Sequence, residues 1–274
     1  MFRPLFFMKY PAAYLAGLIV FTSATGYSTV LFQDSADLAN FTTANTNATT
    51  ARILVVNGST TPVSTLDGDA LRFSDTATGL LPALRHQTNV ALADALKVSF
   101  DVKIASVSSN IVFRVGPDAS LLGAASSSSF GVQLTNLGTV ATEQSPSNVN
   151  YASSYSTANR FNLTMFYNAS DTAIDLTAHN GPASLGSHKW ALYVDGTLKS
   201  SALAEKSSQT YGGSFGFAWL SGTGASANAM DFQLDNIEYT NISAIPEPSS
   251  AAALFGFGAL GFVAFGRRRR ALTS

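Results

Sequence analysis

Residues 96–104, LKVSFDVKI, constrain the fold of this chain more than any other stretch. Apolar side chains occupy every second position, and lysine, serine or aspartate fills the positions between them. This period of two is typical of a β-strand with one buried side and one solvent-facing side, because an amphipathic helix repeats its apolar residues every three or four positions. The stretch therefore predicts a strand that buries Val98, Phe100 and Val102.

Short apolar or alternating runs recur along the rest of the chain between turn signals, without a long amphipathic helix. They number about ten, and their spacing favours an antiparallel all-β sandwich over alternating βαβ units. The expected strands are residues 52–56, 70–73, 96–104, 110–115, 130–134, 160–167, 173–178, 190–194, 214–220 and 232–239.

Two segments specify the sandwich further. Residues 188–196, HKWALYVDG, run from a strand into an Asp-Gly pair, which is typical of a tight hairpin turn. They resemble the W-x-L-Y-V-D-G hairpin of concanavalin A-like and laminin-G-like jelly rolls. Residues 232–238, FQLDNIE, resemble the terminal strand of such sandwiches and of related carbohydrate-binding modules. The resemblance implies an all-β fold, an antiparallel jelly-roll β-sandwich, with another antiparallel sandwich as the alternative.

The C-terminal stretch predicts a membrane anchor outside this fold. Pro246 and Pro248 lack a backbone N–H and favour an extended conformation at the residue before each of them. An uncharged run of 18 residues, 249–266, follows and would span roughly 27 Å as a helix, enough for a bilayer core. A buried core helix and an ordinary tail anchor are the alternatives. A stop-transfer signal that stays in the cytoplasm is expected from the four arginines Arg267, Arg268, Arg269 and Arg270.

The same stretch resembles a known sorting signal. Pro246, Glu247, Pro248 and Ser249, followed by a Gly-, Ala- and Phe-rich span and an arginine cluster, are similar to the PEP-CTERM signal of Gram-negative bacteria. The resemblance covers residues 244–274, about a tenth of the chain. It implies that an exosortase-type membrane transpeptidase recognises the tail, processes the protein near Pro-Glu-Pro and passes it to the cell surface or extracellular matrix.

The other end of the chain also predicts export. Arg3 and Lys9 come first without an acid, an almost wholly apolar run follows at residues 11–21, and small residues come next. This is the order of a secretory signal peptide that signal peptidase removes, and an uncleaved N-terminal anchor is the alternative. The expected organisation is a signal peptide at 1–26, a β-sandwich domain at 27–243 and the sorting signal, with its inner-membrane helix, at 244–274.

Composition narrows the partners of the exported part. The chain has no cysteine, so neither a disulfide framework nor a thiolate metal site is available. Six of its 16 basic residues are Arg3, Lys9 and the four terminal arginines, which leaves ten basic residues against 17 acids. An acidic body argues against nucleic acid as a partner.

Few groups in the sequence point to catalysis. Glycosidases use two carboxylates about 5 to 10 Å apart, whereas Glu143 and Glu205 are isolated in the sequence. The nearest cluster contains Asp235 and Glu238, which are three positions apart and are expected on opposite faces of a strand. We therefore expect no catalytic residue and a non-enzymatic surface protein. A jelly-roll lyase or hydrolase and a ligand-free structural protein are the alternatives.

Candidate binding residues are aromatic or acidic. Tyr151 and Tyr155 lie in a polar segment, so their rings are the candidates for stacking on glycans such as an exopolysaccharide, while Trp190 and Trp219 are expected in the core.

Asp-Gly pairs are more often plain turns than calcium ligands, and no other cofactor is expected. The candidate oxygen ligands for calcium are Asp67, Asp69 and Asp235.

Overall fold

The computed structural model describes residues 28–33, 52–56, 63–67, 70–75, 83–88, 90–107, 110–118, 121–135, 137–144, 146–221 and 230–243. These residues form one β-sandwich of two antiparallel sheets, and their helical elements are short 3-10 turns, including η3 (Ala125–Ser127) and η4 (Thr177–His179). None of the described helices is long and apolar enough to cross a membrane. The predicted signal peptide and sorting signal lie outside the described residues.

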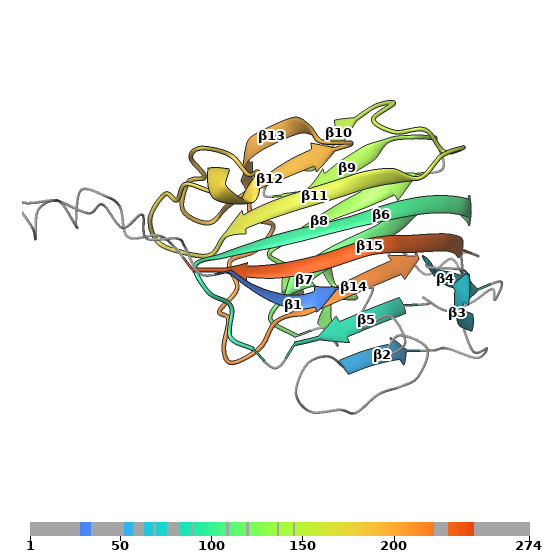
Figure 1. The fold of residues 1–274 in the computed structure, drawn as a ribbon, viewed down its shortest axis with the longest axis horizontal. Coiled ribbons are helices and arrows are strands. Elements are labelled where there is room, and N and C mark those ends of the chain that lie inside the picture. Colours follow the sequence, from blue (N-terminus) through green and yellow to red (C-terminus); the bar gives the residue numbers. More distant parts are fainter. Residues whose placement is uncertain are drawn as a thin grey trace, which may run out of the picture.

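The larger sheet has the strand order β13-β12-β11-β6-β15-β4-β3, and β1 pairs with the second half of β15. Figure 1 shows this sheet in front of the smaller one. Its strands are β1 (Ser28–Gln33), β3 (Val63–Asp67), β4 (Ala70–Asp75), β6 (Ala95–Val107), β11 (Phe161–Asn168), β12 (Lys189–Val194), β13 (Thr197–Ala204) and β15 (Met230–Ile242).

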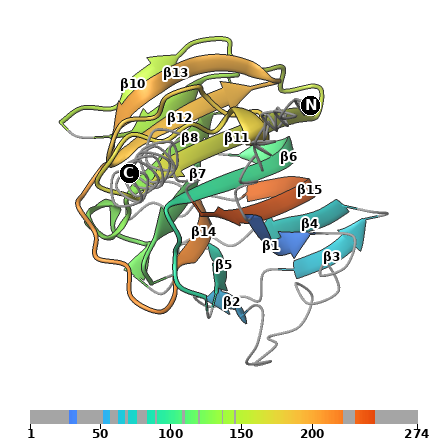
Figure 2. The ribbon, with the colours of Figure 1, turned by 60° about the vertical axis from the view of Figure 1, so that its left-hand side comes forward.

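The smaller sheet has the order β10-β9-β8-β7-β14-β5-β2. In the turned view of Figure 2, β14, β5 and β2 form a layer separate from β15, β4 and β3. The strands of the smaller sheet are β2 (Arg52–Val56), β5 (Ala83–Gln87), β7 (Asn110–Gly116), β8 (Phe130–Thr135), β9 (Val140–Glu143), β10 (Val149–Tyr151) and β14 (Gly216–Ser221).

The last two strands are inserted into the middle of the two sheets. In the smaller sheet β14 lies between β5 and β7, and in the larger sheet β15 lies between β4 and β6. The two sheets are therefore completed by strands that are distant in sequence from their neighbours. This arrangement confirms the predicted all-β jelly-roll sandwich.

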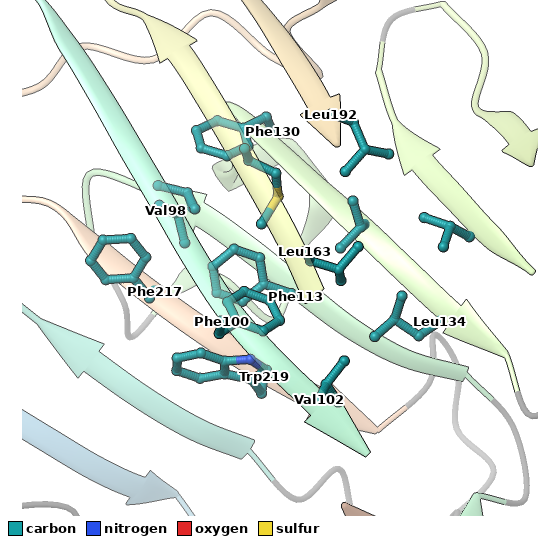
Figure 3. Close-up of a cluster of buried hydrophobic side chains, with 14 of the residues drawn as sticks. Val98, Phe100, Val102, Phe113, Phe130, Leu134, Leu163, Leu192, Phe217 and Trp219 are labelled. Atoms are coloured by element: carbon teal, nitrogen blue, oxygen red, sulfur yellow. The ribbon is translucent and has the colours of Figure 1, made fainter. Parts of the chain in front are cut away.

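The core lies between the two sheets. Val98, Phe100 and Val102 on β6 are buried, as the alternation of residues 96–104 predicts. The ring of Phe100 lies 4.9 Å from Phe113 on β7 and 5.9 Å from Trp219 on β14, both in edge-on contacts (Figure 3). Trp190 and Trp219 are likewise buried, so the prediction that both tryptophans belong to the core is confirmed.

The predicted strand at residues 173–178 is wrong. Ile174 forms a single bridge with Leu185, and the chain then turns into η4. The carboxylate of Asp175 causes this turn, because Oδ1 accepts hydrogen bonds from the N–H and the hydroxyl of Thr177 at 2.8 and 2.7 Å. Ile174, Leu176 and Leu185 instead pack on the outer face of the larger sheet, against Phe166, Ala191 and Ile242.

The two ends of the described chain leave the sandwich at one end, which we call the exit pole and define by Ser28, Ala95, Asn168 and Ile242. Ser28 on β1 lies opposite Ile242 on β15, and Ala95 on β6 lies opposite both Ile242 and Asn168. Figure 1 shows β15 ending at the left of the view, where β1 begins. The opposite end, the far pole, contains Val107 and Met230.

Candidate functional site

The outer face of the larger sheet carries a row of polar side chains, which we call the polar patch: Ser99, Asp101, Asn162, Thr164 and Asn236. On β6 and β11 the side chains that alternate with the core residues point to this face. The register places Asn162 opposite Asp101 and Thr164 opposite Ser99. Asn236 is exposed and the other four are partly exposed, so the patch is accessible from solvent.

Hydrogen bonds hold the side chains of the polar patch in fixed orientations. The amide of Asn162 donates to Oδ1 of Asp101 at 2.7 Å, and the amide of Asn236 donates to Oδ2 of the same carboxylate at 2.8 Å. The Thr164 hydroxyl donates to Oδ1 of Asn162 at 2.9 Å and lies 2.9 Å from the Ser99 hydroxyl. Three neighbouring strands thus present donors and acceptors whose directions are set by one another.

A β-bulge brings Asn236 into the patch. Asp235 lies opposite Asp101, and Glu238 lies opposite Ser99, so β15 contains one residue more than β6 over this interval. Asn236 has a φ of 49°, a left-handed conformation that asparagine tolerates better than most residues. The bulge turns both acids to the outer face, so the prediction that Asp235 and Glu238 lie on opposite faces is wrong.

Each of these two acids forms an ion pair. Arg160 contacts Asp235, and Nζ of Lys97 lies 2.9 Å from Oε1 of Glu238. Burial raises the pKa of Glu238, but hydrogen bonds from Lys97 and Thr240 outweigh it and leave this pKa below its usual value. A general acid needs the opposite shift, so this pair of carboxylates is poorly suited to glycoside hydrolysis.

The predicted calcium ligands are only partly within the described structure. Asp235 is engaged with Arg160, and the side chains of Asp67 and Asp69 lie outside the described residues. In the described parts of the chain, no group of three or more His, Asp or Glu side chains is arranged to hold a metal ion. Calcium therefore stays a prediction.

The Asp-Gly turn borders the polar patch. Asp195 and Gly196 have φ values of 49° and 70°, as a type I′ turn requires, and the predicted positive φ of Gly196 is confirmed. Asp195 donates its N–H to the carbonyl of Asn162 at 3.0 Å, and its Oδ1 accepts the N–H of Asn162 at 2.8 Å. The hairpin turn is therefore fixed to the start of β11 beside the patch.

An aromatic ring lies next to the patch. Tyr193 on β12 lies opposite Thr164, is half-buried, and makes an edge-on contact with Phe166 at 5.8 Å between ring centroids. Sequence reasoning chose Tyr151 and Tyr155 instead. The pattern WALYV could have identified Tyr193, because Trp190, Leu192 and Val194 alternate with it and face the core.

Tyr155 is not the exposed ring that was predicted. Its side chain is only 8% exposed, its ring stacks on Phe161 at 3.9 Å, and its hydroxyl donates to the carbonyl of Thr135. Burial raises the pKa of the Tyr155 phenol. Tyr151 is half-buried and packs against the core, so only part of its ring is accessible. Because its ring is enclosed in this way, Tyr155 cannot stack on a sugar.

The outer face of the smaller sheet is partly closed by residues 121–129. Arg114 on β7 forms a bidentate ion pair with Glu143 on β9, with distances of 2.7 and 2.8 Å, and both side chains are almost fully buried. Nη1 of Arg114 also donates to the carbonyls of Leu122 and Gly123 at 3.0 and 2.8 Å. This buried pair fastens the loop to the sheet, so Glu143 has a structural role.

A family model for the PEP-CTERM protein-sorting motif matches residues 244–270. The match contains the predicted motif Pro246, Glu247, Pro248 and Ser249 and the four arginines, all outside the described structure. This motif marks exported proteins that are anchored in the membrane before exosortase processes them and are afterwards on the cell surface or extracellular. The chain is thus an exported PEP-CTERM protein with a jelly-roll body.

No curated protein sequence matches the chain. Among solved structures, the binding domain of botulinum neurotoxin DC, solved with rat synaptotagmin II, is 10% identical, with a TM-score of 0.43 over 74% of this chain and 46% of that one. The chain thus spans about half the length of that domain. The Emp47p carbohydrate recognition domain is 10% identical, with a TM-score of 0.40 over 73% of this chain and 93% of that one.

The galectin LEC-6 of Caenorhabditis elegans is also 10% identical, with a TM-score of 0.32 over 58% of this chain and 94% of that one. TM-scores and identities this low carry no argument about what the chain binds.

Proposed function

We propose that the exported sandwich is a non-enzymatic glycan-binding module and that the polar patch, with Tyr193 beside it, is its binding surface. The observation that supports this most directly is the hydrogen-bonded row of Asp101, Asn162 and Asn236 across three strands. Sugar hydroxyls both donate and accept hydrogen bonds, and a surface whose amides and hydroxyls are already oriented loses little conformational entropy when it binds them.

The surroundings of the patch also suit a neutral sugar. Tyr193 offers an amphipathic ring at one side, in the manner of aromatic residues at binding surfaces. Arg160 and Lys97 are already paired with Asp235 and Glu238, which leaves Lys103, two positions beyond Asp101, as the exposed lysine of β6 beside the patch, a weak attraction for a polyanion. An exopolysaccharide rich in hydroxyl groups is the partner that fits, and the exported location brings the surface to it.

The test measures binding of the purified full-length chain, in detergent, to a glycan array and to insoluble polysaccharides. Asn162→Ala removes the amide that orients Asp101, and we expect it to weaken binding about tenfold, the equivalent of one good hydrogen bond. Asn150→Ala is the matched control, because Asn150 is exposed on β10 of the smaller sheet. The expected pattern is equal binding by wild type and by Asn150→Ala and about tenfold weaker binding by Asn162→Ala.

Two other outcomes would overturn the proposal. Failure of the wild-type chain to bind any glycan would favour a ligand-free structural protein. Release of new reducing ends or unsaturated sugars from a bound polysaccharide would favour a jelly-roll hydrolase or lyase. In that case Asp235 and Glu238 would be the first residues to substitute in a search for the catalytic groups.

A further inference from the structure

The exit pole connects the sandwich to both predicted membrane segments. β1 begins at Ser28, directly after the predicted signal peptide, and β15 ends at Ile242, just before the sorting motif. Because these two strands are antiparallel neighbours with Ser28 opposite Ile242, the chain enters and leaves the sandwich at the same place.

The end of β15 is firmly held. It lies between β1 and β6, which pair with it up to Ile242. The side chain of Asn241 donates to the carbonyl of Ala91 at 2.9 Å and accepts the N–H of Ala93 at 2.8 Å. The strand therefore stays paired up to Ile242, and the connection to the membrane begins only after that residue.

This connection is shorter than the sandwich is tall. Six residues lie between Ile242 and Ser249, where the uncharged run begins, and even a fully extended chain over these seven Cα–Cα steps reaches only about 25 Å. β15 itself has 13 residues, which corresponds to about 43 Å along the strand. With Ile242 held this close to the bilayer, the far pole cannot be the end that faces the lipid.

We propose that the anchored precursor stands with its exit pole toward the membrane, so that the Pro-Glu-Pro motif lies in a narrow gap between this pole and the bilayer. The processing enzyme must then work in that gap. Asp101 lies six residues beyond Ala95 along β6, about 20 Å from the pole. The polar patch is therefore held away from the lipid while the protein is still anchored.

The test uses the absence of cysteine from the chain, because single cysteines can be introduced into the natural sequence. Ala91 and Ala158 are both exposed alanines. Ala91 lies beside Asn241 at the exit pole, whereas Ala158 precedes the start of β11, the end of that strand away from the exit pole. The Ala91→Cys and Ala158→Cys chains, with the predicted signal peptide removed and the sorting signal left intact, are placed in phosphatidylcholine vesicles. Each is treated with a small impermeant maleimide, which reports the outward-facing fraction, and with a bulky polyethylene-glycol maleimide.

We expect the bulky reagent to react several-fold more slowly at position 91 in vesicles than in detergent, and equally fast in both at position 158. A long Gly-Ser insertion after Ser243 should restore the rate at position 91. Equal rates at both positions in vesicles, or protection that persists despite the insertion, would overturn the proposal. The test involves no glycan, so its result is independent of the proposed function.

Discussion

His86 on β5 shows how one side chain can tie the stability of the sandwich to pH. Its imidazole is fully buried, with its ring centroid 5.9 Å from that of Phe217 and 5.5 Å from that of Tyr239. Burial among these rings lowers the pKa of His86 from its ordinary 6.5 to about 3. The unfolded chain therefore takes up a proton on this residue at mildly acidic pH, whereas the folded chain does not.

The expected consequence is a loss of stability on acidification. The pKa of His86 is lower in the folded chain than in the unfolded chain. The stability that the neutral, buried imidazole contributes is therefore fully present above about pH 6.5 and decreases as the pH falls toward 3. The slope is about 1.4 kcal/mol per pH unit for one proton. His86→Leu should remove this slope, so urea unfolding of wild type and variant between pH 7 and pH 4 should diverge steadily.

Phe130→Leu separates packing from protonation in that experiment. It also removes a buried aromatic ring, which stacks on Tyr167, but Phe130 lies on β8, three strands away from β5, and leucine carries no titratable group. Its loss of stability should therefore be nearly the same at each pH. If the difference between wild type and His86→Leu were equally constant, protonation of His86 would not be the cause.

At the scale of elements, the hairpin of β12 and β13 is the part whose sequence and structure agree most closely. Val194 lies opposite Thr197, so Asp195 and Gly196 alone form the loop. The same turn holds the backbone of Asn162 through two hydrogen bonds. The conformation of this turn therefore bears on the polar patch as well as on the hairpin.

Gly196→Val should destabilise the protein by more than about 1 kcal/mol, because a β-branched residue strongly resists a positive φ. Nothing lies within 4 Å of a Cβ added at Gly196, so the cost is one of backbone conformation and not of collision. Gly196→Asn is the matched control and should cost less, since asparagine tolerates this conformation. Thermal unfolding of both variants measures the difference, and equal melting temperatures would contradict the argument.

Local alternation predicted most of the long strands, but long-range pairing decided the remaining details. The predicted strand at 96–104 lies within β6, and the strand at 52–56 matches β2. The bulge at Asn236 was not predictable, because it exists only relative to the register of β6. At 173–178, the side chain of Asp175 overrode an apparently alternating pattern.

The candidate site was less predictable than the fold. Tyr155 reads as a loop residue, yet Phe161 and Thr135, which enclose it, come from two different strands. The polar patch joins residues from β6, β11 and β15, which are more than 60 positions apart in sequence from one strand to the next. Only the order of strands in the sheet brings them together.

At the scale of the whole molecule, the sandwich and the sorting motif are separate along the chain. The last described strand ends at Ile242, and the sorting motif begins at residue 244. The motif therefore lies outside every strand of the described fold.

Replacing Pro246, Glu247 and Pro248 with alanines should leave export and folding intact but keep the protein in the membrane. The physical reason is that the hydrophobic span and arginines still anchor the chain, while the stiff extended strip that the processing enzyme recognises is gone. Fractionation of membrane, surface and medium measures the outcome. Normal transfer of this variant to the surface would contradict a role for the three residues in processing.

The central positions of β14 and β15 have a consequence for the order of events during biosynthesis. These strands are the last to be synthesised, and until they have crossed the membrane β5 and β7, like β4 and β6, lack the neighbour that joins them. Pairings between such distant segments form slowly, and the unpaired edges invite aggregation meanwhile. The exported chain must therefore be kept from collapsing until its end arrives. Since β15 ends just before the sorting motif, completion of the sandwich and capture by the membrane become nearly simultaneous steps.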